Sequence, residues 1–252
     1  FPNVGVVKVF ARTVGSEDCP DVLHSEVYDV VPAYSPGAAD DGSLAVPMDH
    51  PEFIGWAERM VDVKYGDAVE ARYRTPDRAL GPALGETLDV VSLGQGGVAT
   101  VGFADPVVDG PGSDFAVFEN AFGDTFLELA FVEVSSDGVH FARFPNAYLG
   151  LSPIGRFGGH DPALIRGLAG KHRAGFGTPF DLAELARADA VLTGRVDLRH
   201  ITQVRVVDIV GDGGTLDSFG NPIYDPYPTL MSGGFDLEAV GVFHSVATAP
   251  CP

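Results

Sequence analysis

Cysteine, basic residues and long apolar runs are all scarce in this chain of 252 residues. No apolar run approaches the roughly 20 residues that a membrane-spanning helix needs, so no transmembrane segment is predicted. Lysine and arginine together number 16 against 35 acidic residues, which gives a formal charge of −19. Because a protein with that charge repels polyanions, we expect no nucleic-acid partner.

The two cysteines, Cys19 and Cys251, lie near opposite ends of the chain. An even cysteine count and an acidic composition are typical of exported proteins, so the pair is expected to form a disulfide. Such a crosslink would close a loop spanning most of the chain and would contribute about 4 to 5 kcal/mol of stability. The alternative is two unrelated thiols.

Motifs of common enzyme classes and of transition-metal sites are missing as well. The sequence contains neither a G-x-S-x-G nucleophile elbow nor a P-loop. Its seven histidines are scattered, and there is no C-x-x-C motif, so zinc and covalent haem are not expected. Acidic residues are too abundant for spacing alone to nominate a glycosidase pair. A non-catalytic protein is therefore the favoured hypothesis.

Short runs of β-type sequence dominate what is present. The runs are rich in β-branched and aromatic residues and are bounded by Gly, Pro, Asp or Asn. They cover residues 90–93, 98–103, 115–119, 129–135, 201–210 and 235–243. The last two alternate apolar with polar or small residues, so each is expected to bury one face and expose the other. Asp137 and Gly138 predict a tight hairpin turn between antiparallel segments.

Two short helices are predicted beside these strands. Between residues 51 and 65, apolar side chains recur at a helical spacing. These side chains are Phe53, Trp56, Ala57, Met60 and Val61. The second helix is expected at residues 180–188, where a Thr or Asp cap precedes good helix formers.

The predicted fold is mainly β: a single jelly-roll-like antiparallel β-sandwich with long loops and two short helices. The sandwich is assigned to residues 51–252. Residues 1–50 are expected to form an N-terminal strand and an extended loop that packs on the main domain or mediates its contacts.

Acidic residues in turns rich in Gly and Pro are the main site candidates. One loop places Asp217, Asn221 and Asp225 four residues apart, and Asp208 and Asp212 precede it. Calcium takes roughly six to eight oxygen ligands from carboxylates, amides and backbone carbonyls, which such a loop can supply. The alternative is a solvated acidic loop, since Asp, Asn and Gly are ordinary turn residues.

A second acidic group surrounds one predicted strand. Asp109 and Asp114 flank a Pro-Gly turn before this strand and fit a hydrogen-bonded corner or metal ligation equally well. Glu119 and Asn120 follow after about five residues of about 3.3 Å each, too far from Asp114 for one small ion. Together with Glu133 they form a separate candidate cation site.

Aromatic and basic residues are candidates for ligand contacts. Phe219, Tyr224 and Tyr227 lie in or near the acidic loop, where aromatic rings beside polar groups suit a glycan. His172 lies in the one basic knot of the sequence, between Lys171 and Arg173. This knot suits an anionic ligand, and a solvated loop is the alternative.

Several blocks of the sequence resemble a family of secreted bacterial cell-surface proteins. They include 93–97, 109–120, 128–138 and 220–228. Members of that family often carry sorting signals of the PEP-CTERM or type IX secretion kind. The segment from Val132 to Gly138 is also similar to a strand of discoidin-like and carbohydrate-binding jelly rolls, in which calcium is often structural.

The residues and the resemblance together predict a non-catalytic, calcium-stabilised binding module at the bacterial cell surface. Ca²⁺ is the expected cofactor, a cell-surface glycan or another surface protein is the expected partner, and a signal peptide is expected to have been removed. One alternative is a structural subunit of an extracellular assembly, with contacts through residues 1–50. Another is a carbohydrate-active enzyme.

Overall fold

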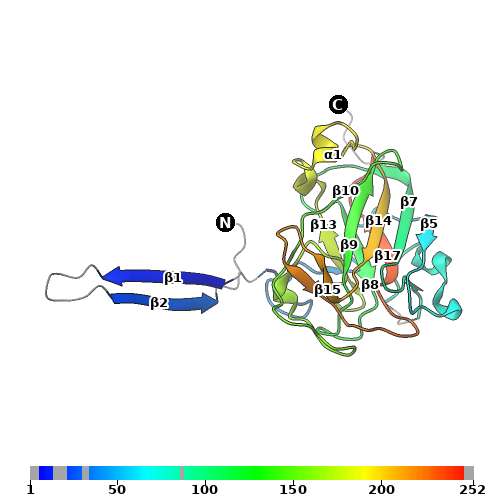
Figure 1. Cartoon of the computed structure of the whole chain (residues 1–252). Helices are drawn as coiled ribbons and strands as arrows, with labels where there is room; N and C mark the ends of the chain where they lie inside the picture. The colour runs from blue at the N-terminus through cyan, green and yellow to red at the C-terminus, as the bar shows by residue number, and fades with distance from the viewer. Residues whose placement is uncertain (1–5, 14–21, 30–33, 86–87, 247–252) are drawn as a thin grey trace.

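The computed structural model describes residues 6–13, 22–29, 34–85 and 88–246 (Figure 1). Near the N-terminus, β1 (Val6–Thr13) and β2 (Val22–Asp29) pair as an antiparallel hairpin. The predicted strand falls in β1. The sequence predicts a loop where β2 lies, because His, Ser and Glu interrupt the apolar pattern of that segment. The cysteines of the predicted disulfide, Cys19 and Cys251, lie outside the described residues.

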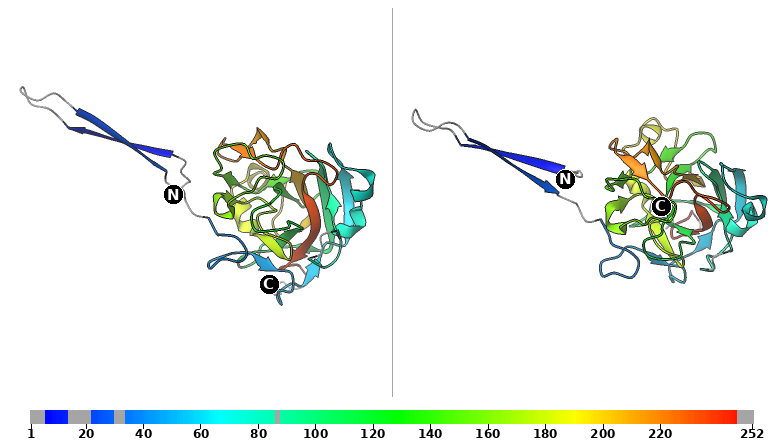
Figure 2. Two further views of the ribbon diagram at one scale, coloured as in Figure 1. Left: turned by 90° about the horizontal axis from the view of Figure 1, so that it is seen from below. Right: turned by 60° about the horizontal axis from the view of Figure 1, so that its bottom comes forward.

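Two antiparallel sheets form the main body, as the views in Figures 1 and 2 show. The first sheet has the order β10, β9, β14, β7, β5, and the second has the order β3, β13, β8, β17, β4 with β6 beside β17. The first contains β5 (Arg59–Lys64), β7 (Val98–Val107), β9 (Ala130–Ser135), β10 (Ala142–Arg143) and β14 (Ile201–Asp208). The second contains β3 (Val46–Pro47), β4 (Gly55–Trp56), β6 (Val91–Ser92), β8 (Phe115–Glu119), β13 (Phe176–Phe180) and β17 (Asp236–Val242).

Smaller elements connect these strands. β11 (Ala147–Tyr148) pairs with β12 (Ile165–Arg166), and β15 (Asp212–Leu216) pairs with β16 (Pro222–Tyr224). Helical structure in the described ranges is limited to α1 (Asp189–Leu192) and the 3₁₀ turns η1 (Ala71–Tyr73), η2 (Pro76–Ala79), η3 (Pro162–Leu164) and η4 (Leu182–Leu185). The mainly β antiparallel sandwich predicted from the sequence is confirmed.

The main core lies between the two sheets. Alternate residues of the first sheet, such as Val132 and Val204, bury their side chains in the same apolar cluster as Phe115 and Val240 of the second. Since side chains on a strand alternate between faces, this cluster takes one face of each sheet. Removing that apolar area from water is the dominant stabilisation of the sandwich.

The second sheet is buried on both faces, which differs from the one-sided burial predicted for residues 235–243. Every residue of β17 is buried. On the outer face, Ala239 and Phe118 form a separate cluster against Phe53 and Trp56. A segment from the N-terminal part of the sandwich therefore covers this face and excludes water from it.

The predicted helix at residues 51–65 is wrong, because this segment forms β4 and β5. β4 pairs with β17 of the second sheet, whereas β5 pairs with β7 of the first. The helical spacing of the apolar residues has another cause: Phe53 and Trp56 pack on the outside of the second sheet, and Met60 joins the main core. The segment thus crosses from one sheet to the other. Of the helix predicted at residues 180–188, only Leu182–Leu185 are helical, as the 3₁₀ turn η4 that Asp181 caps.

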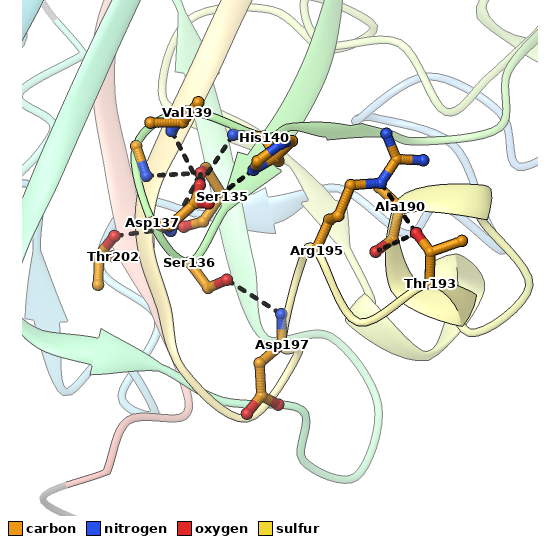
Figure 3. Close-up of polar contacts among 11 residues, drawn as sticks. Ser135, Ser136, Asp137, Val139, His140, Ala190, Thr193, Arg195, Asp197 and Thr202 are labelled. Atoms are coloured by element: carbon orange, nitrogen blue, oxygen red, sulfur yellow. Dashed lines mark hydrogen bonds and ion pairs between the residues drawn. The ribbon is translucent and has the colours of Figure 1, made fainter.

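The tight turn predicted at Asp137 and Gly138 joins β9 to β10, which pair antiparallel. Figure 3 shows how Asp137 holds it: Oδ1 accepts hydrogen bonds from the backbone N–H groups of Val139 and His140, both at 2.8 Å. Ser135 Oγ accepts another from Gly138 at 2.9 Å, and Gly138 has a φ of +76°. Glycine adopts this left-handed backbone conformation without strain, which explains why it occupies this position.

Candidate metal centre

The ends of four central strands bring acidic side chains from both sheets together. Glu119 ends β8 and lies beside the start of β17, which begins at Asp236. Asp208 ends β14 and lies beside the start of β9, two residues after Glu128. In an antiparallel pair the end of one strand lies next to the start of its neighbour. The topology therefore gathers these four acids at one edge of the sandwich.

A fifth acid, Asp225, reaches this edge from the loop after β16. Both of its carboxylate oxygens accept a hydrogen bond from the backbone N–H of Leu129, at 3.1 and 3.2 Å. Nε2 of His160 lies 3.0 Å from Oδ1 of Asp225, and Nδ1 of the same ring lies 3.4 Å from the hydroxyl of Tyr148. Asp225 is thereby fixed next to the start of β9.

All five carboxylates are buried. The exposed fraction is 9% for Glu128 and 5% or less for the other four. Within the described parts of the chain, no lysine or arginine forms an ion pair with any of them, and His160 is the basic partner of Asp225. Burying a charge without an opposite charge is costly, so the cluster needs either protons or a cation to be stable.

The pKa values of the cluster reflect this burial. Loss of solvation raises the pKa of Asp208 to about 7 and that of Asp225 to about 6. Burial, followed by the negative charge of Asp236, raises the pKa values of Glu119 and Glu128 well above their ordinary range. These carboxyls therefore lie close enough to oppose one another's ionisation.

The five carboxylates differ in the contacts they already make. Phe235 donates from its backbone N–H to Oδ1 of Asp208 at 2.6 Å, and Gly96 donates to Oδ2 at 2.7 Å. Oε2 of Glu119 accepts from Ala121 at 2.9 Å. Oδ1 of Asp236 is buried and has no hydrogen-bond partner among the described residues. Asp208 thus connects the loop at Gly96 to the start of β17 through hydrogen bonds, whereas one oxygen of Asp236 has no hydrogen-bond partner among the described residues.

The acids best placed to hold a cation are Glu119, Glu128 and Asp236, with the neighbouring Asn120, which is also buried. Carboxylate and amide oxygens are ligands that calcium prefers, and its coordination geometry is flexible. Glu119, Asn120, Asp208 and Asp225 were candidates from the sequence. Glu128 and Asp236 were not, although each lies at the start of a strand whose partner ends in an acid, and that pattern could have identified them.

A different acidic group has the closest ligand atoms. Oxygens of Asp109, Asp114 and Asp181 lie within 4.8 Å of one another, which no other group of three in the described residues matches. However, both oxygens of Asp114 accept backbone hydrogen bonds at 2.7 Å, from Gly110 and Leu182, and His244 Nδ1 lies 2.9 Å away. The structure therefore favours the hydrogen-bonded corner for Asp114.

The acidic loop singled out in the sequence is built around its own backbone. Oδ1 of Asp217 accepts from the N–H groups of Phe219 and Asn221, and Oδ2 accepts from Tyr148 and from the Asn221 side chain, all at 2.8 to 3.0 Å. Asp212 similarly accepts from the backbone of Gly214 at 2.8 Å. These two carboxylates therefore stabilise turns, and Asp217 and Asp225 have separate sets of donors.

Glu133 lies apart from the strand-end acids and is neutralised by arginines. Arg143 Nη2 lies 2.7 Å from Oε1 of Glu133, and Arg205 Nη1 lies 3.3 Å from Oε2. The structure therefore gives Glu133 two arginine partners, whereas the buried cluster has none in the ranges that the structure describes.

The aromatic and basic residues predicted to contact a ligand differ in their exposure to solvent. Phe219 and Tyr227 are 51% and 37% exposed, whereas Tyr224 is half-buried against the second core cluster. His172 is only 2% exposed and lines a cavity with Lys171. The basic knot is therefore not a solvated loop at these two residues.

Comparisons with protein-family models, with curated proteins and with solved structures gave no significant match to this chain. Within the described ranges, every helix is too short to cross a membrane. The fold and the site thus define a mainly β sandwich with a buried cluster of carboxyl groups where its two sheets meet.

Proposed function

We propose that the protein is a non-catalytic extracellular binding module in which calcium joins the two sheets at one edge. The observation that carries this proposal is the set of five buried carboxylates that have no lysine or arginine partner among the described residues. A divalent cation would offset their mutual repulsion and supply a partner for Oδ1 of Asp236. Binding requires Glu119, Glu128 and Asp236 to close around the ion from their present positions.

A cell-surface glycan is the proposed partner of the module. Phe219 and Tyr227 support this proposal because both rings are exposed beside polar turn residues. A glycan array probed in calcium should give binding that Phe219→Ala weakens. Silence of the array with calcium-saturated protein would argue against this partner.

The metal proposal is tested by measuring bound calcium and thermal stability in the same samples. Elemental analysis after equilibration with CaCl₂ should find calcium in stoichiometric amount, and EDTA should lower the Tm. The double variant Glu128→Gln, Asp236→Asn should lose both the metal and the Tm response. Asp41→Asn removes an exposed acid and serves as the matched control, with an unchanged response.

If the protein contains no calcium and EDTA leaves its Tm unchanged, protons rather than a cation neutralise the cluster. A response to Mg²⁺ equal to that with Ca²⁺ would overturn the assignment of calcium, because Mg²⁺ demands a near-octahedral site.

A further inference from the structure

A cavity of about 200 Å³ shares no lining residue with the acidic cluster. The cavity is bounded by the chain around Tyr34, by η4 and by residues of β12 and β13. Its lining includes Phe144, Arg166, Lys171, His172, Thr178 and Phe180. It is smaller than the roughly 300 to 1,000 Å³ of sites for drug-sized ligands, so it suits a small molecule.

Three polar side chains of this lining are at least nine-tenths buried. Lys171, His172 and Thr178 have exposed fractions of 5%, 2% and 5%. Nδ1 of His172 and Oγ1 of Thr178 have no hydrogen-bond partner among the described residues. Such groups cost free energy when they are buried unsatisfied, and a ligand that bonds to them after a small movement of the two side chains would recover it.

Lys171 adds a positive charge to the same cavity. Its Nζ donates to the backbone carbonyl of Ile165 at 2.7 Å, and it forms no ion pair with a carboxylate in the part of the chain described. Burial lowers the pKa of Lys171 to about 8, so the ammonium group is still charged at neutral pH. An ammonium has three donors, and further acceptors can therefore bind to it.

His172 complements this charge as a neutral partner. Burial and the adjacent Lys171 lower the pKa of His172 to about 3. A neutral imidazole carries one N–H donor, and the Thr178 hydroxyl is another. The cavity thus combines one positive charge with two neutral donors, which matches an anion with more than one acceptor oxygen.

The remaining walls restrict which anion fits. The rings of Phe144 and Phe180 pack with centroids 4.9 Å apart among the lining residues, and Leu44, which is 66% exposed, adds apolar surface for an organic body. Arg166 is paired with Glu184 at 3.2 Å, and Asp181 also lines the cavity. These acids, together with the net charge of −19, disfavour dianions and polyanions.

We propose that this cavity binds a small organic monocarboxylate. Its carboxylate bonds to Lys171, His172 and Thr178, and its apolar body lies against Leu44, Phe144 and Phe180. The site is independent of the calcium proposal, since it shares no residue with the acidic cluster.

Benzoate is the probe, and its neutral analogue benzamide is the ligand control. Isothermal titration calorimetry should show saturable binding of benzoate and at least tenfold weaker binding of benzamide. Lys171→Met should weaken benzoate binding at least tenfold. Lys64→Met removes an equivalent charge from a lysine whose side chain is 79% exposed, and it should leave binding unchanged.

Thr178→Val provides a variant that keeps the size of the side chain and its β-branched shape. It should weaken benzoate binding severalfold while circular dichroism shows an unchanged fold. This variant therefore tests the site even if Lys171→Met does not fold. Absence of saturable binding, equal affinity for benzamide, or unchanged affinity in the folded Lys171 or Thr178 variant would each overturn the proposal.

Discussion

Replacing Asp114 by alanine should destabilise the protein strongly and independently of calcium. The Asp114 carboxylate is fully buried and accepts backbone N–H groups from the turn at Gly110 and from Leu182 at the start of η4. Without the carboxylate these two donors lose their acceptor, and each unsatisfied donor costs about 1 to 3 kcal/mol. We expect a total loss of about 4 kcal/mol.

The assay is thermal unfolding of the wild type and the variants, each with calcium and with EDTA. For a domain of this size, about 4 kcal/mol corresponds to a fall in Tm of about 8 to 16 °C. Asp109→Ala should cost much less because Asp109 is exposed, and Asp181→Ala should cost about 1 kcal/mol through its cap on η4.

If Asp109, Asp114 and Asp181 formed a metal site, the three alanine variants would have similar losses, present in calcium and absent in EDTA. That pattern would refute the assignment of Asp114 to a hydrogen-bonded corner.

Three further predictions follow from other contacts. Glu133→Gln should leave the calcium-induced rise in Tm unchanged, because two arginines neutralise Glu133; a lost response would return this residue to the metal site. Gly170→Ala should cost more than about 2 kcal/mol in urea unfolding, because its φ is +80° and a Cβ would lie 1.8 Å from a backbone carbonyl oxygen; an unchanged midpoint would contradict this. Burial lowers the pKa of Lys171 from 10.5 to about 8. At a pH between these two values, Lys171 therefore holds a proton in the unfolded chain that it has lost in the folded chain. Wild-type stability should therefore rise with pH across that interval relative to Lys171→Met, by up to about 3 kcal/mol; parallel curves would disprove it.

The strands could be predicted from the sequence because their signals are local. Runs such as Ala130–Ser135 combine β-branched residues with clear boundaries, and the Asp137 turn specifies its own geometry through short-range hydrogen bonds. The segment from Phe53 to Val61 could not be predicted in this way. Its apolar spacing results from contacts with two different sheets, and local periodicity does not distinguish such contacts from one helical face.

The candidate site was predictable only in part, for a related reason. Glu119 stands out at the end of a strand and Asp225 in a loop, but their neighbours depend on strand pairing. Glu128 and Asp236 lie close to Glu119 and Asp225 in sequence, but their place in the cluster depends on the register of β9 and β17. Conversely, Asp217 has the residue types of a calcium loop but uses its oxygens for nearby backbone donors.

The assembly of the acidic cluster from both sheets has a consequence for when an ion can bind. Its members come from strand ends far apart along the chain, so no isolated hairpin or loop contains the complete set of ligands. High-affinity binding then requires that β8 and β17 have already docked against β9 and β14. On the proposal that the ion is calcium, a chain held where calcium is scarce would neutralise these carboxyls with protons, and calcium would bind only after both sheets have folded.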